Sequence, residues 1–227
     1  MSEPMMMPEG WGIFHLFCKT GPNSDGQRVA AAVKEASEGD HQVVSVAMFG
    51  HKADVCFMAL GPDLWRLRGL QRDLQAAGLE IVDSYVSITE ISEYAKGLPE
   101  PMRQARLYPE FPPEGKSAFC FYPMSKRRLP GDNWYQLPFD ERVALMSEHG
   151  KSGRNFAGRI VQLITGSTGL DDYEWGVSLF GLSPIDLKDC VYTMRFDEAS
   201  ARYAEFGPFY MGLVAPLDEV LANVGLS

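Results

Sequence analysis

The sequence predicts an α+β protein made of two similar halves, each with the element order β-α-β-β-α-β. Strand-like and helix-like apolar patterns alternate in this order from residue 11 to residue 91, and the same order returns after residue 117. The stretch between them, residues 94–116, carries five prolines and no regular apolar period, as a linker does. Because this order is that of a ferredoxin-like unit, we expect two such modules with antiparallel sheets.

The first half shows clear start and stop signals for its helices. Asp25 can cap the first helix, and the second begins after Pro62 and stops at Gly78. Gly50-His51-Lys52 separates two β-rich runs and indicates a hairpin. In order, the predicted elements are a strand at 13–17, a helix after Asp25, strands at 43–49 and 53–60, a helix after Pro62 and a strand at 79–91.

The second half repeats this order without an evident sequence repeat. Its predicted elements are a strand at 117–124, a helix at 139–157, strands at 159–166 and 173–180, a helix at 184–194 and a strand at 201–214. We therefore expect an N-terminal module at residues 1–100, a linker at 101–116 and a C-terminal module at 117–227.

Composition limits the classes of partner. The formal net charge is −9 and the hydrophobic residues make up 45% of the chain. A chain this acidic lacks the positive field that nucleic acid and anionic membranes require, so an anionic ligand needs a local cluster of cations. We see no secretory signal and no apolar run of bilayer length. The four cysteines are widely spaced, and three lie within apolar runs; we expect buried reduced thiols in a cytoplasmic protein.

Two polar side chains interrupt apolar strands. Gln162 shares a face with Ile160 and Ile164, and Tyr122 shares a face with Cys120 and Met124. A buried amide or phenol needs a hydrogen-bond partner or a ligand. Taken alone, each is more often a core residue whose hydrogen bonds are satisfied than a functional one.

His149 is the histidine with the most suggestive context. It lies on the predicted helix at 139–157 and is followed by Gly150 and Gly153, which leave room for a flat group, although an ordinary helix end explains them equally well. A single histidine without a convergent partner suits haem iron, because the porphyrin supplies the other four nitrogens. Cations suited to carboxylates lie nearby in sequence, namely Lys126, Arg127, Arg128 and, in the linker, Arg106. A solvated basic turn is the competing explanation for Arg127 and Arg128.

Long strings in the C-terminal half resemble the coproheme decarboxylase branch of the chlorite dismutase-like family. They are RLYP (106–109), CFYPMSKRR (120–128), NWYQLP (133–138), ERVALMSEHGKSGR (141–154), LITGSTGLDDYEWGVSLF (163–180) and MRFDEASARYAEFGPFY (194–210). The N-terminal half matches more loosely, chiefly at 49–62 and 84–94. The resemblance implies a dimeric α+β barrel within one chain, with a porphyrin in the C-terminal module.

The resemblance also implies an activity and partners. The substrate is Fe-coproporphyrin III (coproheme), the co-substrate is hydrogen peroxide, and the product is haem b, formed when two propionates become vinyl groups with loss of carbon dioxide. Members of the branch commonly form homopentamers, and a transient contact with coproporphyrin ferrochelatase is implied.

Roles carried over from the family fall on residues of the matching strings. His149 corresponds to the axial ligand of the iron, and Tyr122 to the tyrosine whose radical takes a hydrogen atom from a propionate. Lys126 corresponds to a lysine that holds a propionate and takes part in catalysis. The remaining expected contacts with the porphyrin or its propionates are Arg106, Pro123, Met124, Ser125, Gln162 (at the distal position) and Ser200.

Two further classes remain open at this stage. One is a haem peroxidase or chlorite-decomposing enzyme, and the other is a non-catalytic porphyrin-binding or haem-sensing protein. Chlorite dismutases carry an arginine at the position of Gln162, so the neutral amide argues against chlorite chemistry. A haem-ligating histidine usually donates its second ring nitrogen to an acceptor; Glu198 and Glu205 are candidates, and the sequence does not choose between them.

Overall fold

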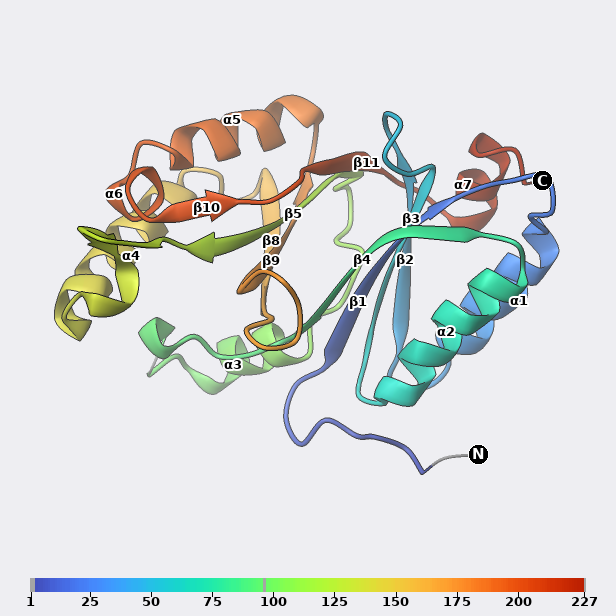
Figure 1. Ribbon diagram of the computed structural model, residues 1–227, viewed down its shortest axis with the longest axis horizontal. Coiled ribbons are helices and arrows are strands. Elements are labelled where there is room, and N and C mark those ends of the chain that lie inside the picture. Colours follow the sequence, from blue (N-terminus) through green and yellow to red (C-terminus); the bar gives the residue numbers. More distant parts are fainter. Residues whose placement is uncertain (1–2, 96, 227) are drawn as a thin grey trace.

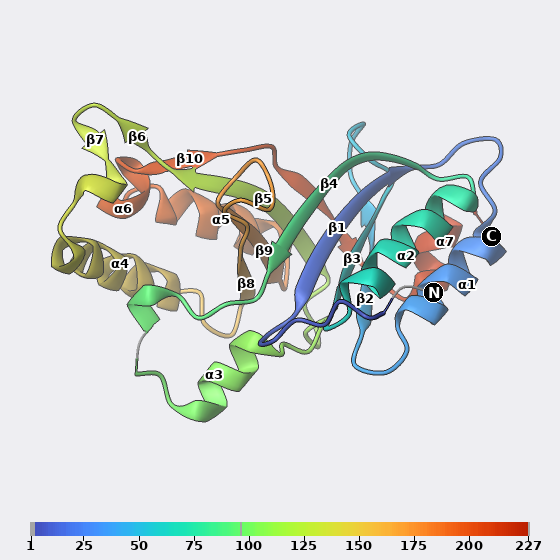
Figure 2. The same cartoon turned by 60° about the horizontal axis from the view of Figure 1, so that its bottom comes forward.

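Eight antiparallel strands close into a barrel in the computed structural model, which describes residues 3–95 and 97–226 (Figure 1). Around the barrel the order is β5-β11-β2-β3-β1-β4-β8-β9, and β9 pairs with β5 to complete the circle. Helices α1 and α2 lie at one end of the molecule and α4 lies at the other (Figures 1 and 2).

The first module has the predicted order and the strand arrangement β2-β3-β1-β4. Its elements are β1 (Gly12–Lys19), α1 (Gly26–Ala36), β2 (Gln42–Met48), β3 (Val55–Gly61), α2 (Leu64–Ala76) and β4 (Glu80–Ile88). Asp25 caps α1 as expected, since its carboxylate accepts the Arg28 N–H, and Asp63 caps α2 in the same way through the Trp65 N–H.

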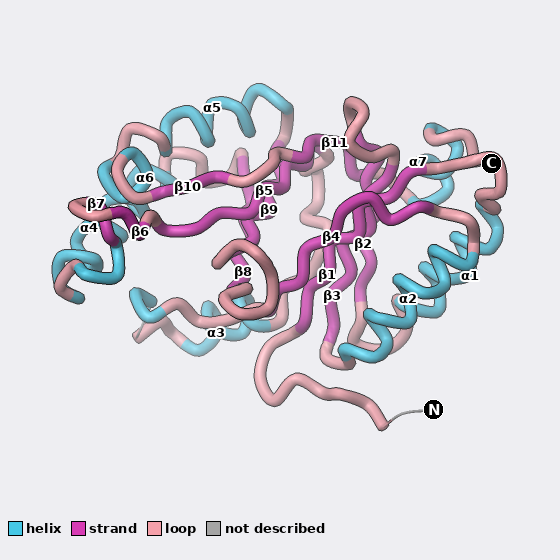
Figure 3. Tube along the Cα trace, in the orientation of Figure 1, coloured by secondary structure: helices cyan, strands magenta, loops and turns pink. Residues whose placement is uncertain are grey.

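The second module repeats the arrangement as β11-β5-β9-β8 (Figure 3). Its main elements are β5 (Ala118–Lys126), α4 (Phe139–Arg154), β8 (Ile160–Gly166), β9 (Trp175–Gly181), α5 (Pro184–Met194) and β11 (Tyr210–Val214). Smaller elements are the hairpin of β6 (Arg128–Leu129) and β7 (Asp132–Asn133), α6 (Glu198–Ala201), β10 (Ala204–Phe206) and α7 (Leu217–Asn223), with short 3₁₀ helices at 93–95 and 134–136. Both units are therefore ferredoxin-like, and the predicted fold class is confirmed.

Each module closes the barrel by pairing its last strand with the second strand of the other module. β11 pairs with β2 from Gly212↔Met48 to Val214↔Val46, whereas β4 meets β8 through the single pair Ile88↔Gly166. The fourth strand of one unit thus adds to the edge of the other, which leaves neither edge of the paired sheets open.

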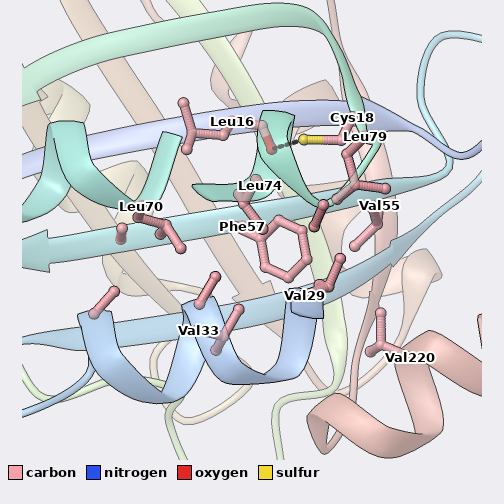
Figure 4. Close-up of a cluster of buried hydrophobic side chains, with 14 of the residues drawn as sticks. Leu16, Cys18, Val29, Val33, Val55, Phe57, Leu70, Leu74, Leu79 and Val220 are labelled. Carbon is pink, nitrogen blue, oxygen red and sulfur yellow. Dashed lines mark hydrogen bonds between the residues drawn. The ribbon is translucent and has the colours of Figure 1, made fainter. Parts of the chain in front are cut away.

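The first module contributes to two apolar cores. Outside its sheet, α1, α2 and α7 pack on apolar residues of β1 and β3, so that Val29 of α1 and Leu70 of α2 lie in one cluster with Phe57 of β3 (Figure 4). Inside the barrel, residues of both modules form one core that includes Phe17 of β1 and Phe121 of β5. The interior core therefore depends on both halves of the chain.

The linker folds onto the first module. It contains a helix, α3 (Glu100–Leu107), that the proline-rich sequence did not predict. The side-chain amide of Gln42 donates to the Pro109 carbonyl at 3.0 Å and accepts from the Phe111 N–H at 2.7 Å, which ties this segment to β2.

The expected last strand at 201–214 is wrong as a single element. It divides into β10 and β11 around Gly207-Pro208, and both parts pair with β5. Phe206 lies opposite Met124, so an unbroken register would place Tyr210 opposite Cys120, yet Tyr210 lies opposite Phe121. Pro208 has no N–H for the ladder, and the extra residue is absorbed at this break. None of the described helices is long and apolar enough to cross a bilayer.

Candidate functional site

The outer face of three neighbouring strands in the second module carries the first group of predicted residues. Opposite Tyr122 of β5 lies Val177 of β9, and opposite Val177 lies Ile164 of β8. The next row is made of Cys120, Leu179 and Gln162. Directly opposed residues share a face of a sheet, so Tyr122 and Gln162 lie on the same face, which α5 covers in part.

The β8 end of this face is not covered. Gln162 is exposed and Ile164 is 46% exposed, so the expectation that Gln162 is buried is wrong. The neighbouring helix α4 packs against α5 and α6, and none of its sixteen residues is buried. An exposed apolar strand beside a helix without a buried side gives a ligand apolar surface to cover.

His149 projects from α4 and is held through one ring nitrogen. Its Nδ1 lies 3.1 Å from both carboxylate oxygens of Asp197 and 3.3 Å from the Ser200 hydroxyl. The expected acceptors are therefore wrong: Glu198 faces Arg202 at 3.7 Å, and Glu205 faces Arg127 at 3.6 Å. Among the described residues Nε2 of His149 has no hydrogen bond, so this nitrogen is free to bind a metal.

Asp197 is held in place by the turn that it begins. It is buried, and it caps the short helix α6 by accepting the N–H of Ser200 at 3.1 Å. Burial alone raises the pKa of this carboxyl, but hydrogen bonds from His149 and Ser200 outweigh it and lower the pKa below its ordinary value. The carboxylate is thus charged and fixed, as an orienting acceptor for an imidazole must be.

Tyr122 lies in an apolar environment on the same face of the sheet. Its ring stacks on Phe209 at 4.6 Å and meets Phe206 edge-on at 5.6 Å. Burial, with smaller effects of the thiols of Cys120 and Cys190, raises the pKa of the phenol well above its ordinary value. Its hydroxyl makes no hydrogen bond within residues 3–95 and 97–226, so the phenol is neutral and open to a ligand.

Lys126 is buried four residues further along β5. Its ammonium donates to the Ala199 carbonyl at 2.9 Å and lies 4.2 Å from the centre of the Trp134 ring. Burial lowers its pKa to about 8, although the carboxylates of Asp197 and Glu174 act in the opposite direction. Near neutral pH the group is therefore mostly charged.

Helix α6 connects these groups. Lys126 contacts Ala199, and the flanking residues Ser200 and Asp197 contact His149. Ser200 is buried and turned toward the imidazole. Three of the predicted site residues (Lys126, His149 and Ser200) are thus joined through α6, and Tyr122 lies four residues before Lys126 on the same face of β5.

The other predicted residues are more scattered. Met124 packs on the outer face with Tyr122, whereas Pro123 and Ser125 point to the other face of β5, where the Ser125 hydroxyl accepts the Glu174 N–H at 3.2 Å. Arg106 is exposed on α3, and no hydrogen bond or ion pair of its side chain occurs in the described part of the chain.

The basic run after β5 is not a free cationic cluster. Arg127 lies 3.6 Å from Glu205, and Arg128 is largely exposed with a carboxylate oxygen of Glu174 at 4.0 Å. The solvated turn describes Arg128, whereas Arg127 is half-buried and its Nε is shielded from solvent. Of these three cations only Lys126 has a buried side chain.

Sequence reasoning missed Asp197 and Trp134. The signal for Asp197 was present, because an aspartate three residues before Ser200 is a helix-capping pattern. Trp134 gave no such signal, since a 3₁₀ turn brings it under Lys126 only in the folded chain.

The donor set fits a porphyrin better than a bare metal ion. No group of three or more His, Cys, Asp or Glu side chains within the described ranges could hold a metal. One imidazole nitrogen, fixed from behind by a carboxylate, is enough for haem iron because the macrocycle fills the equatorial positions.

Comparison with known proteins identifies the family. The chlorite dismutase family matches residues 24–215. A Staphylococcus carnosus protein named coproheme decarboxylase is 40% identical over 95% of this chain and 96% of its own length. A Natronomonas pharaonis protein named as a candidate heme-binding protein is 41% identical over 92% of this chain, which spans only 40% of that longer protein.

Solved structures give the same result for the fold. A protein from Thermus thermophilus, described as a novel heme-binding protein, superposes with a TM-score of 0.87 at 38% identity and covers 99% of this chain and 100% of its own. A mutant chlorite dismutase from Candidatus Nitrospira defluvii superposes with a TM-score of 0.71 at 21% identity over 96% of this chain and 97% of its own. The chain belongs to the chlorite dismutase family.

Proposed function

We propose that the protein binds Fe-coproporphyrin III through Nε2 of His149 and decarboxylates two of its propionates to give haem b. The observation that carries the proposal is the imidazole of His149, held at Nδ1 by the buried Asp197 and free at Nε2. The 40% identity to a protein named coproheme decarboxylase supports the choice of substrate.

The chain's own groups suit an acidic porphyrin. The charged ammonium of Lys126 is the inward-facing cation of this end of the module. Arg106 is exposed and without an ion pair among the described residues, so it is available to a propionate that reaches α3. We propose that Met124, Gln162 and Ser200 line the porphyrin and that Pro123 and Ser125 shape the edge of β5 that faces it.

Hydrogen peroxide balances the reaction. Each propionic acid group and one molecule of peroxide give a vinyl group, carbon dioxide and two molecules of water. The bound iron porphyrin supplies the redox chemistry that activates peroxide. Tyr122 would give up an electron and its phenolic proton to the peroxide-oxidised substrate, and its oxygen would then take a hydrogen atom from the propionate carbon next to the ring. The carbon radical so formed would lose its remaining electron to the same oxidised substrate. The bond to the carboxyl carbon would then break, giving the vinyl group and carbon dioxide, and the carboxyl proton would leave in water. The high pKa of Tyr122 keeps that proton on the phenol until the electron leaves.

The decisive experiment is anaerobic loading with ferric coproporphyrin III, titration with peroxide and mass spectrometry of the pigment. We expect loss of two carboxyl groups in the wild type. Tyr122→Phe should retain binding and abolish the loss, whereas Tyr192→Phe, which changes an exposed tyrosine of α5, should behave as the wild type. An unchanged pigment mass in the wild type contradicts the proposal.

Iron ligation is tested separately from turnover. His149→Ala should change the ferric optical spectrum of the loaded protein, because the axial nitrogen is lost. An unaltered spectrum removes His149 from this role.

The second candidate function is porphyrin binding without catalysis, because two relatives are described only as heme-binding proteins. The same titration separates the two, since a binding protein returns the pigment unchanged. A homopentamer, a cytoplasmic location and a transient contact with coproporphyrin ferrochelatase remain predictions that sedimentation, fractionation and cross-linking can check.

A further inference from the structure

Three oxidisable rings lie together beside α4, the helix that carries His149, and each has a cation over it. These rings, Trp134, Tyr94 and Tyr203, form what we name the aromatic cluster; Trp134 lies 5.4 Å from Tyr203 and 6.3 Å from Tyr94. The cations and their distances to the ring centres are Lys126 over Trp134 (4.2 Å), Arg202 over Tyr203 (5.1 Å) and Arg142 over Tyr94 (5.8 Å).

The aromatic cluster is well placed to lose electrons to an oxidant bound at His149. Trp134 packs against Leu145 and Met146, which lie one turn before His149 on the same helix. Trp134 and Lys126 are both buried, so the charge of Lys126 is poorly screened at the indole. Arg142 and Arg202 are paired with Glu93 and Asp132 at 2.7 and 2.6 Å, so their effect on Tyr94 and Tyr203 is smaller.

Tyr122 has different neighbours. The rings that contact it are Phe206 and Phe209, which are harder to oxidise than a phenol. Arg195 lies 4.7 Å from the centre of the Phe206 ring, and its charge has a small effect on the pKa of Tyr122, opposite to that of burial. In the described part of the chain no cation lies over the Tyr122 ring itself.

A cation on a ring face opposes oxidation of that ring. The contact is attractive because the neutral ring presents a negative face, and this attraction becomes repulsion when the ring loses an electron.

Without the Lys126 ammonium, the net charge near Trp134 becomes more negative. The carboxylates of Asp197 and Glu174 are close enough to Lys126 to act on its charge. Removing the ammonium leaves these anions without their buried counter-charge, and anions favour a positively charged ring.

We propose that Lys126, Arg142 and Arg202 protect the aromatic cluster from one-electron oxidation, so that the oxidising equivalent remains available to Tyr122. The inference rests on the proposed function only for the source of the oxidant. In the wild-type protein Tyr122 loses one electron and one proton to the oxidised substrate. In a variant without Lys126, Trp134 supplies that electron instead, and no hydrogen atom is taken from a propionate.

The first test uses the protein without porphyrin and is independent of turnover. Azide radicals serve as the one-electron oxidant, and peptide mass spectrometry measures the fraction of Trp134 that is oxidised. Lys126→Met should raise this fraction on the order of tenfold, the effect expected for a desolvated cation–π contact, and Lys126→Arg should restore the wild-type value. Lys188→Met, which removes a cation 5.3 Å from the exposed ring of Tyr192, is the matched control and should leave Trp134 unchanged.

The second test identifies the radical in the protein loaded with ferric coproporphyrin III. After peroxide and rapid freezing, electron paramagnetic resonance should show a tyrosyl radical that Tyr122→Phe removes. Lys126→Met should show a tryptophanyl radical, and Lys126→Met combined with Trp134→Phe should return the tyrosyl radical.

The outcomes separate this inference from the proposed function. Equal oxidation of Trp134 in the wild type and Lys126→Met without porphyrin overturns the protection. If the wild-type protein leaves the mass of the pigment unchanged, the proposed decarboxylase activity is wrong. A raised oxidation of Trp134 in Lys126→Met without porphyrin would still support the protective role of Lys126. If Lys126→Met does not fold, Arg142→Gln and Arg202→Gln test the same effect at Tyr94 and Tyr203.

Discussion

At the residue scale, the direction of His149 depends on a carboxylate that caps the next short helix. Asp197 lies 3.1 Å from Nδ1 and is fixed by the Ser200 N–H, so the imidazole presents Nε2 away from α6. The hydrogen bond from Nδ1 to this buried carboxylate fixes the orientation of the ring and leaves Nε2 as the nitrogen that can bind iron.

Removing that acceptor should weaken porphyrin binding. We expect Asp197→Asn to reduce the affinity for ferric coproporphyrin III by about 10- to 100-fold, the usual effect of losing an orienting partner of a metal ligand. Optical titration of the protein measures the affinity. Glu198→Gln is the matched control, because this neighbouring carboxylate faces Arg202 instead of His149; an equal loss in both variants would contradict the role of Asp197.

A second histidine gives a prediction about stability. His15 is fully buried in the barrel, with Nε2 2.9 Å from the Ser178 hydroxyl and Nδ1 without a partner among the described residues. Burial lowers its pKa from 6.5 to about 3. Between these pH values His15 binds a proton in the unfolded chain but not in the folded chain. Its contribution to the free energy of unfolding is therefore fully present above pH 6.5 and decreases as the pH falls toward 3.

His15→Gln should remove this dependence. The free energy of unfolding of the wild type should fall more steeply than that of the variant below pH 6, by up to about 1.4 kcal/mol per pH unit. Urea unfolding at a series of pH values measures both. Parallel curves for the two proteins would show that His15 is not the titrating group.

Residue roles were the least predictable part of the site. Tyr122 and Gln162 could be assigned to faces of their strands by period-2 alternation, and the register confirms that they share one. Which of these faces is covered is a tertiary property, so the burial of Gln162 was predicted wrongly. The acceptor of His149 was likewise misassigned, because the choice among Asp197, Glu198 and Glu205 depends on where a four-residue helix turns.

At the element scale, α4 differs from the helices of the first module. α2 buries Leu67, Leu70 and Leu74 against its sheet, whereas α4 buries none of its residues. Most helical stability in proteins comes from packing of an apolar face. Without a ligand, α4 is held only by half-buried side chains such as Leu145 and Met146, so it gains less from apolar packing than α2 does.

Hydrogen exchange should reveal this difference. We expect the amides of α4 to exchange faster than those of α2 in the protein without porphyrin, and to slow when ferric coproporphyrin III is bound. The exchange of α2 should not change on loading and serves as the internal reference. Equal protection of α4 before and after loading would show that the ligand does not contact this helix.

Elements with a strong local signal were predicted well. Asp25, Pro62 and Gly78 mark helix ends correctly because capping and chain reversal are local effects. The division of the last strand at Gly207-Pro208 and the helix α3 were missed, since each depends on contacts with segments distant in sequence, namely β5 and the first module.

At the scale of the whole molecule, barrel closure makes the two modules dependent on each other. The element order of the two modules could be derived from the sequence, but the strand pairs that join them, β11–β2 and β4–β8, could not. The closure at β11–β2 requires Gly212, where an added Cβ would lie 2.3 Å from the Ala47 carbonyl oxygen. Only the structure shows that this glycine is needed for close approach of two strands from different halves.

This dependence predicts the behaviour of a chain cut between the modules. A protease site inserted after Gly115, in an exposed loop where added atoms meet nothing, should be cleaved without loss of structure. The two fragments should remain together as a one-to-one complex in size-exclusion chromatography, because the interior core draws on both, from Phe17 to Phe121. Expressed alone, the first fragment exposes the edges of β2 and β4 and should self-associate. The same cut in Gly212→Val should give a complex that separates at a lower urea concentration, because the β11–β2 seam is forced apart. Fragments that part after cleavage and stay monomeric would contradict the shared core.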